Sequence, residues 1–228
     1  MYRYWCAAAA LFYGVISMTI ARERYALYAV TDRVRARTAE ELLAQAAAVI
    51  RGGAQIVQLR EKELPFGEFL DEARQFVALC RELGAVSIIN DNVEIARLTG
   101  ADGVHVGQED MAAARAREIL GAGKLVGVSA HTVEEARAAY EMGADYLGCG
   151  AAFVTGTKTD AKPISRETIR AVTSSVPIPV VAIGGITREN LPELAGLGLA
   201  GAAVASALFA QDDPEAAARE LLPVCQSL

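Results

Sequence analysis

This chain has few histidines, no closely spaced pair of cysteines and no excess of positive charge, and each of these features excludes a class of site or partner. Only two histidines, His105 and His131, occur in 228 residues, and the four cysteines are scattered with no CxxC spacing. Zinc sites need clustered Cys and His ligands, so the sequence disfavours a zinc centre and predicts reduced thiols. A net charge of −6 argues against non-specific binding to nucleic acid or to an anionic membrane.

The amino terminus carries an uncharged, apolar stretch, Tyr4 to Ala21, which follows Arg3. A run of this length reaches the lower limit for a membrane span, and a basic start before an apolar run is also typical of a signal peptide. A membrane anchor, an extra helix that caps the main domain, and an extension upstream of a true start at Met18 all fit the pattern. We favour the last, because a complete strand–helix pattern begins only at Tyr25.

From that point short apolar runs alternate with longer amphipathic segments, without a low-complexity linker. Near-continuous apolar runs are typical of parallel strands buried on both faces. The predicted strands are Tyr25–Thr31, Gln55–Leu59, Ser87–Ile89, Gly103–Val106, Lys124–Val128, Tyr146–Cys149, Val180–Ile183 and Ala202–Ala205. The predicted helices are Ala39–Arg51, Phe66–Leu83, Val93–Thr99, Met111–Leu120, Val133–Met142, Arg166–Ser174, Arg188–Leu197 and Pro214–Leu222.

This alternation predicts an α/β protein, a single (β/α)₈ TIM barrel over residues 21–228 with residues 1–20 as a short apolar extension. A doubly wound open sheet is the structural alternative. In a barrel the active site forms at the carboxyl ends of the strands, so polar residues that follow each apolar run are the candidates for chemistry.

The second predicted strand ends in Gln58-Leu-Arg-Glu-Lys62. Alternation of side chains along a strand places Gln58, Arg60 and Lys62 on one side, with Leu59 and Glu61 on the other. Two cations and an amide suit a diphosphate, because Arg offers a bidentate fork and Lys a point charge. A surface cluster of salt bridges is the alternative interpretation.

Two carboxylates follow the next two strands. Asp91 comes after Asn90, and Asp110 closes the run that begins at His105. Carboxylates beside a diphosphate would repel it without a hard cation, so this pair predicts Mg²⁺ as the cofactor. The alternative is that Asp110 caps a helix that begins at Met111.

The fifth strand end offers a hydroxyl and an imidazole. Ser129 is placed to hydrogen-bond a phosphate or a ring nitrogen, but no GxSxG pattern marks it as a nucleophile. His131 is either an acid–base group or a structural hydrogen-bonding residue. His105 lies inside an apolar run, which favours a buried, hydrogen-bonded role.

The remaining polar segments predict a second phosphate site. The longest loop, 150–164, contains Thr155-Gly156-Thr157-Lys158 and is typical of a lid over phosphates. Gly184 and Gly185 end the seventh strand, and Ala205 and Ser206 end the eighth. Loops after these two strands form the recurrent phosphate site of barrels.

Seven segments in order resemble the thiamine-phosphate synthase family: QLREK, INDN, ADGVHVGQED, GVSAHT, the TxTKxD loop, AIGGI and VASA. The resemblance implies transfer of a pyrimidinylmethyl group from its diphosphate to a phosphorylated thiazole, plain or carboxylated, with release of pyrophosphate. It implies Mg²⁺ ligands at Asp91 and Asp110, and chemistry assisted by Arg60, Lys62, Ser129 and Lys158. The implied pyrimidine diphosphate site is Gln58, Leu59, Arg60, Glu61, Lys62, Asn90, Ser129 and Lys158. The implied thiazole phosphate site is Thr155, Gly156, Thr157, Gly185, Ala205 and Ser206.

Three rival interpretations stay open. A thiazole tautomerase would keep the thiazole site without coupling; the pair Asp110 and Lys158 argues against it, while His131 is compatible with it. An unrelated phosphate-binding barrel would not need two carboxylates, and a non-catalytic thiazole-phosphate sensor would need only the second site. We expect a cytoplasmic enzyme whose partners are small phosphorylated molecules, without nucleic acid or membrane, and the sequence is compatible with a homo-oligomer.

Overall fold

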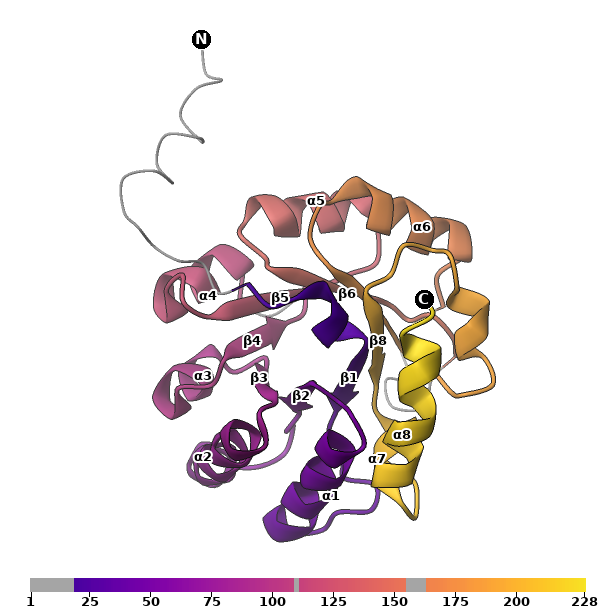
Figure 1. Cartoon of the computed structure of the whole chain (residues 1–228). Coiled ribbons are helices and arrows are strands. Elements are labelled where there is room, and N and C mark those ends of the chain that lie inside the picture. Colours follow the sequence, from indigo (N-terminus) through magenta and orange to yellow (C-terminus); the bar gives the residue numbers. More distant parts are fainter. Residues whose placement is uncertain (1–18, 109–110, 155–162) are drawn as a thin grey trace.

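A computed structural model describes residues 19–108, 111–154 and 163–228. Eight parallel strands form a closed barrel, in which β1 pairs with both β2 and β8 (Figure 1). The strands are β1 (Leu27–Val30), β2 (Ile56–Leu59), β3 (Val86–Asn90), β4 (Gly103–Val106), β5 (Leu125–Ala130), β6 (Tyr146–Gly150), β7 (Val180–Ile183) and β8 (Gly201–Val204). The predicted TIM barrel is therefore confirmed, and the open sheet is wrong.

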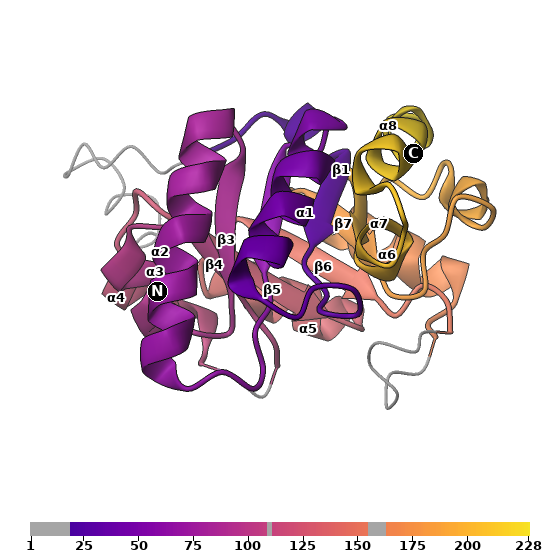
Figure 2. The ribbon, with the colours of Figure 1, turned by 90° about the horizontal axis from the view of Figure 1, so that it is seen from below.

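Helices surround the barrel on its outside (Figures 1 and 2). They are α1 (Ala39–Arg51), α2 (Phe66–Leu83), α3 (Val93–Thr99), α4 (Ala113–Leu120), α5 (Val133–Glu141), α6 (Arg166–Ser175), α7 (Ser206–Phe209) and α8 (Pro214–Cys225), with two 3₁₀ turns, η1 (Arg22–Tyr25) and η2 (Leu191–Leu194). The predicted bounds of α1, α2 and α3 are confirmed residue for residue. Local signals explain this accuracy: Thr38, for example, caps α1 through a capping box with Glu41.

The predicted helix Arg188–Leu197 is wrong. Only η2, a four-residue 3₁₀ turn, forms in this segment. Pro192 lies within it and cannot supply the main-chain N–H that a continuing α-helix needs. The Asn190 side chain also bonds the main chain on both sides, accepting from Thr187 N at 2.8 Å and donating to Gly185 O at 2.8 Å. These bonds shape a compact loop instead of a helix.

The barrel interior and the layer between strands and helices form two separate cores. The inner one holds Tyr25, Tyr28, Val30, Ile56, Val86, Ile88, Leu125, Tyr146, Val181 and Ala203. Its large tyrosines need room, and β5 supplies it at Gly127, where a Cβ would overlap the phenol ring of Tyr146. The outer core includes Leu59, Phe76 and Val104, which point from the strands or helices into the layer between them.

Cys80, Cys149 and Cys225 are buried and free of disulfides, which confirms the prediction for these three thiols. Burial raises the pKa of the Cys149 thiol to about 12, so it stays protonated and unreactive at neutral pH. Across the described residues, no helix is both long and apolar enough to pass through a bilayer. Residues 1–18 of the predicted extension 1–20, which include the suggested start at Met18, lie outside the described residues.

Candidate functional site

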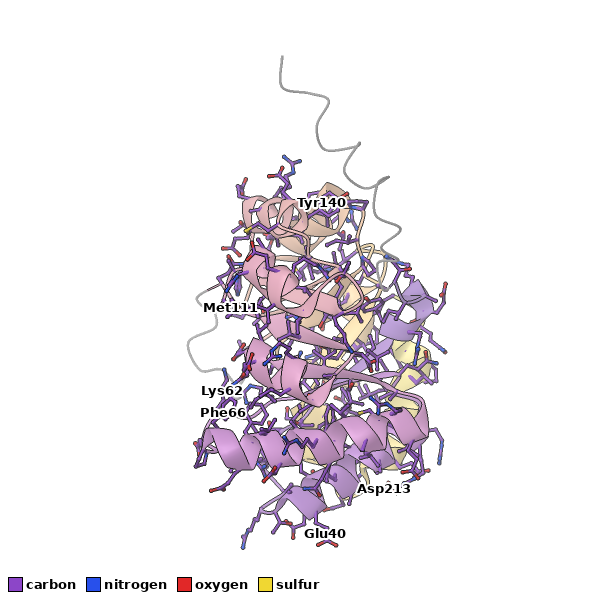
Figure 3. All side chains as sticks on the ribbon, turned by 90° about the vertical axis from the view of Figure 1, so that its left-hand side faces the viewer. Glu40, Lys62, Phe66, Met111, Tyr140 and Asp213 are labelled. Atoms are coloured by element: carbon purple, nitrogen blue, oxygen red, sulfur yellow. The ribbon has the colours of Figure 1, made fainter. Side chains whose placement is uncertain are left out.

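A pocket opens where the strands end at their carboxyl side, the place at which barrel enzymes carry their active sites. Its cavity measures about 270 Å³. Figure 3 shows Lys62 at the end of the molecule where α2 begins with Phe66. The predicted site residues that line the pocket are Gln58, Arg60, Lys62, Asn90, Asp91, Ser129, Gly185, Ala205 and Ser206. Tertiary structure thus brings together residues that the sequence spreads over nearly 150 positions.

The end of β2 alternates as predicted. Gln58, Arg60 and Lys62 face the pocket, whereas Leu59 is fully buried in the outer core and Glu61 points away from the pocket. Gln58 is only 4% exposed, so its amide lies at the floor of the cavity. A substrate contact by Leu59 or Glu61 could involve only the main chain or an indirect effect, since neither side chain lines the cavity.

Glu61 instead belongs to a buried ion triad. Arg33, in the loop after β1, forms ion pairs with Glu61 and with Glu72 on α2. Both carboxylates have side chains that are 3% exposed. Sequence analysis missed Arg33, although a cation just beyond the first strand was a visible signal. The triad fixes the main chain between the two pocket cations that flank Glu61.

The end of β3 carries the one non-glycine residue with positive φ among the described residues, Asp91 at φ 60°. Its main-chain N–H donates to His105 O at 2.8 Å, and its carboxylate pairs with Lys62. Strained backbone of this kind is typical of functional positions. Asp110 lies outside the described residues. The alternative role for it, capping a helix at Met111, is wrong because α4 begins at Ala113 with Ala112 as its cap residue.

Ser129 and the two histidines lie on the β4–β5 side. Ser129 Oγ is 3.0 Å from His105 Nε2, and His105 Nδ1 is 3.2 Å from the Tyr146 hydroxyl. His105 is 7% exposed, which confirms its buried, hydrogen-bonded role. His131 also lines the pocket, and its Nδ1 lies 3.0 Å from a Glu135 carboxylate oxygen. This partner can orient the imidazole of His131 without fixing its function.

The β7 and β8 side of the pocket consists largely of main chain. Gly184 and Gly185 have φ of 98° and 64°, and a Cβ on Gly185 would overlap the carbonyl oxygen of Val154. Glycine is therefore required here, and its exposed main chain suits an anionic group. Ala205 and Ser206 adjoin it at the start of α7, a short helix that the sequence did not predict. The predicted thiazole-site residues Thr155, Gly156 and Thr157, and Lys158, lie outside the described residues.

Within the described part of the chain, no group of three or more His, Cys, Asp or Glu side chains could hold a metal by itself. Asp91 alone contributes a carboxylate to the pocket lining there. A Mg²⁺ ion bound through one or two carboxylates and substrate phosphates does not require a larger protein cluster. The donor chemistry at Asp91 therefore fits this ion.

Comparisons with known proteins agree on one family. The family described as thiamine monophosphate synthase matches residues 27–208. The thiamine-phosphate synthase of Ruminiclostridium cellulolyticum is 46% identical over 88% of this chain and 95% of its own. That of Alkaliphilus oremlandii is 44% identical over 86% and 94%. The solved thiamine phosphate pyrophosphorylase of Pyrococcus furiosus superposes with a TM-score of 0.81 at 37% identity, over 90% of this chain and 96% of its own.

Proposed function

Because the chain belongs to the thiamine monophosphate synthase family of transferases in thiamine biosynthesis, we propose the specific reaction that it catalyses. It couples 4-amino-2-methyl-5-pyrimidinylmethyl diphosphate with a thiazole phosphate and releases pyrophosphate; with the carboxylated thiazole it also releases CO₂. The observation that supports this reaction is one pocket with two chemically different sides. Cationic side chains from β2 line one side, and glycine main chain from β7 lines another. We place the reaction in the cytoplasm, where phosphorylated metabolites are retained.

The cationic side is suited to the diphosphate. Arg60 and Lys62 both line the pocket, and the main chain of Arg60 is held by a bond from its N–H to Thr31 Oγ1 at 2.9 Å. Guanidinium and ammonium groups stabilise the negative charge that develops on a departing diphosphate. Because the main chain of Arg60 is already held in place, little free energy is needed to reorganise this cation during the reaction. We assign Arg60, Lys62 and Lys158 to the neutralisation of the leaving group.

Asp91 and Asp110 would hold Mg²⁺ together with diphosphate oxygens. The ion, when bound, supplies further positive charge against the leaving group. In the structure the Asp91 carboxylate pairs with Lys62, so a cation already balances it. Both groups are at least one-quarter exposed, which leaves them accessible to a ligand from the pocket.

The proposed chemistry needs no protein nucleophile. The bond between the methylene carbon and the diphosphate oxygen breaks, and its electron pair leaves with the diphosphate. The resulting benzylic-type cation is stabilised by the electron-rich aminopyrimidine ring. The lone pair of the thiazole nitrogen then forms the new carbon–nitrogen bond. The protein's contribution is to neutralise the leaving group and to position the two rings.

The thiazole phosphate would lie against Gly185, Ala205 and Ser206. Main-chain N–H groups of glycine turns bind phosphate without the desolvation cost of a second cationic cluster. Occupation of this side would place the thiazole phosphate at the ends of β7 and β8, a different part of the rim from the end of β2 that carries Arg60 and Lys62. Such an arrangement keeps the two phosphorylated groups apart while their rings meet.

The direct test is incubation of the full chain with both substrates and Mg²⁺. Thiamine phosphate and pyrophosphate should form in equal amounts, measured by chromatography and a coupled pyrophosphate assay. A tautomerase would alter the thiazole and release no pyrophosphate. A sensor would bind the thiazole phosphate and form no product. Either result would reject the proposed reaction.

A further inference from the structure

A continuous chain of hydrogen bonds crosses the barrel interior beneath the pocket. Gln58 Nε2 donates to the Tyr28 hydroxyl at 2.7 Å, and the Tyr28 and Tyr146 hydroxyls are 2.8 Å apart. Tyr146 lies 3.2 Å from His105 Nδ1, and His105 Nε2 lies 3.0 Å from Ser129 Oγ. Both end residues, Gln58 and Ser129, line the pocket. The chain therefore joins two pocket walls through Tyr28 and Tyr146, which lie beneath the pocket, and through His105, which also lines it.

The fold provides specific room for this chain. Tyr28 and Tyr146 are each 1% exposed or less, on β1 and β6. Gly127 leaves the space that the Tyr146 ring occupies, and a Cβ on Gly148 would lie 3.1 Å from His105 Cε1. A buried polar chain is favourable only when every member has its partner. Here each of the three interior groups bonds on both sides.

With a neutral imidazole at His105, a count of hydrogens leaves the chain two consistent states. Burial raises the pKa of the Tyr28 and Tyr146 hydroxyls far above the ordinary value, so each keeps its single hydrogen. A neutral imidazole also has one N–H for its two ring nitrogens. Each interior group therefore donates to one neighbour and accepts from the other. The direction of one bond sets the direction of all the rest.

With Gln58 Nε2 donating to Tyr28, the direction runs toward Ser129. Tyr28 donates to Tyr146, Tyr146 donates to His105 Nδ1, and His105 Nε2–H donates to Ser129. The Ser129 hydroxyl hydrogen is then available to donate into the pocket, and the Gln58 amide keeps its carbonyl oxygen to accept and its second N–H to donate. In the reverse state Gln58 presents its N–H and Ser129 presents a lone pair. The direction of the chain therefore decides, for both walls together, whether the Gln58 carbonyl and the Ser129 O–H are available to the pocket or are used within the chain.

We propose that Tyr28, Tyr146 and His105 are positioning residues that set the hydrogen-bond polarity of Gln58 and Ser129 together. This inference rests on the proposed function. An aminopyrimidine presents an amino N–H donor and ring nitrogens that accept. Its pattern matches a pocket with one acceptor wall and one donor wall. In the direction that the structure shows, the intact chain leaves the Gln58 carbonyl free to accept and the Ser129 O–H free to donate, which is the pair of groups that the aminopyrimidine needs.

The sharpest test reads the His105 tautomer by ¹⁵N NMR on the full chain. Only two histidines are present, so selective ¹⁵N-histidine labelling gives two ring systems, and His131 serves as the internal reference. The unsubstituted chain should show His105 protonated at Nε2. Gln58→Glu should reverse the chain once its carboxylate ionises, because a carboxylate only accepts. His105 should then carry its proton on Nδ1. The tautomer is followed from about pH 6 to about pH 9, because this range spans the ionisation of a buried carboxyl group.

The matched control breaks the chain between the two ends. In Gln58→Glu/Tyr28→Phe the His105 tautomer should return to Nε2–H, because the hydroxyl that transmits the change is gone. Persistence of the switch in this double variant would mean a direct field effect and would overturn the inference. An unchanged His105 tautomer in Gln58→Glu over the whole pH range would overturn it as well.

A second test measures affinity for the pyrimidine diphosphate by calorimetry. Tyr28→Phe and Tyr146→Phe should each weaken binding about five- to tenfold, the size of one lost hydrogen bond. The double variant should be no weaker than the weaker single one, because a chain broken once is already uncoupled. Tyr25→Phe is the control: its ring packs 5.4 Å from that of Tyr146, but its hydroxyl forms none of the four bonds. It should bind within about twofold of the unsubstituted chain.

If the losses of affinity multiply in the double variant, or if Tyr25→Phe loses as much affinity as the other two, the cause is general packing damage. Either result would overturn the proposed role of the hydrogen-bond chain. The proposed reaction is judged separately, by product formation in the unsubstituted chain. If product forms but the His105 tautomer does not change in Gln58→Glu, only the role of the hydrogen-bond chain is rejected. If the His105 tautomer changes in Gln58→Glu but the unsubstituted chain forms no thiamine phosphate, only the proposed reaction is rejected.

Discussion

The guanidinium of Arg33 forms an ion pair with the carboxylate of Glu61, the residue that lies between the two cations of the pocket wall. Arg33 also bonds Glu72 on α2, so one cation serves two carboxylates whose side chains are 3% exposed. Removal of the cation would leave two buried charges without compensation. The positions of Arg60 and Lys62 therefore depend on Arg33, which lies in the loop after β1 and not in the segment that carries the two cations.

Arg33→Met should destabilise the fold by about 3 kcal/mol, because it keeps the apolar stem and removes the cation that pairs with Glu61 and Glu72. Urea unfolding measures this change. Arg74→Met is the matched control: Arg74 pairs with Asp71 on the exposed face of α2, and its loss should cost less than about 1 kcal/mol. Equal costs for the two variants would show that the triad contributes no more than a surface pair.

Glu72 should make stability depend on pH. Burial raises the pKa of its carboxyl above the ordinary 4.5, although the bond and charge of Arg33 act in the opposite direction. One of its carboxylate oxygens, Oε1, is also buried and has no hydrogen-bond partner among the residues that the structure describes. Because the folded pKa is the higher one, the stability contributed by Glu72 is fully present below about pH 4.5 and is lost as pH rises through the folded pKa. Relative to Glu72→Gln, the unsubstituted chain should gain stability as pH falls from 7 toward 4.5. A difference that is constant with pH would contradict this prediction.

Asp91→Asn should lower coupling activity by about 100-fold or more with little effect on stability. Asn tolerates the positive φ of Asp91, so the change removes charge and leaves the backbone unstrained. Initial rates over a Mg²⁺ titration measure the effect. Asp71→Asn, on the exposed face of α2, is the control and should retain full activity. Normal activity of Asp91→Asn at limiting Mg²⁺ would reject the metal role.

Gly127→Ala should destabilise the barrel by about 1–3 kcal/mol, because the added methyl overlaps the Tyr146 ring in the inner core. Thermal and urea unfolding give the magnitude. Gly123→Ala is the matched control, since nothing lies within 4 Å of a Cβ at that position. Similar stability of the two variants would mean that the inner core adjusts around residue 127 at little cost.

The local order of strands and helices could be read from the sequence because its signals are local. The bounds of α1, α2 and α3 follow from apolar periodicity and from end signals such as Thr38. Alternation along β2 likewise predicted which of its side chains face the pocket. The segment at Pro192 shows the limit of periodicity, because an apolar pattern alone did not reveal that side-chain bonds from Asn190 would hold a loop.

By itself the sequence determined the barrel, the pocket rim and the family, since strand ends in a closed parallel barrel must converge. Only the tertiary structure decided what supports that rim. Arg33 meets Glu72 across 39 positions, and Tyr28 meets Tyr146 across 118. No local pattern encodes such pairs, because buried charges and hydroxyls gain their partners only when the barrel closes and excludes water.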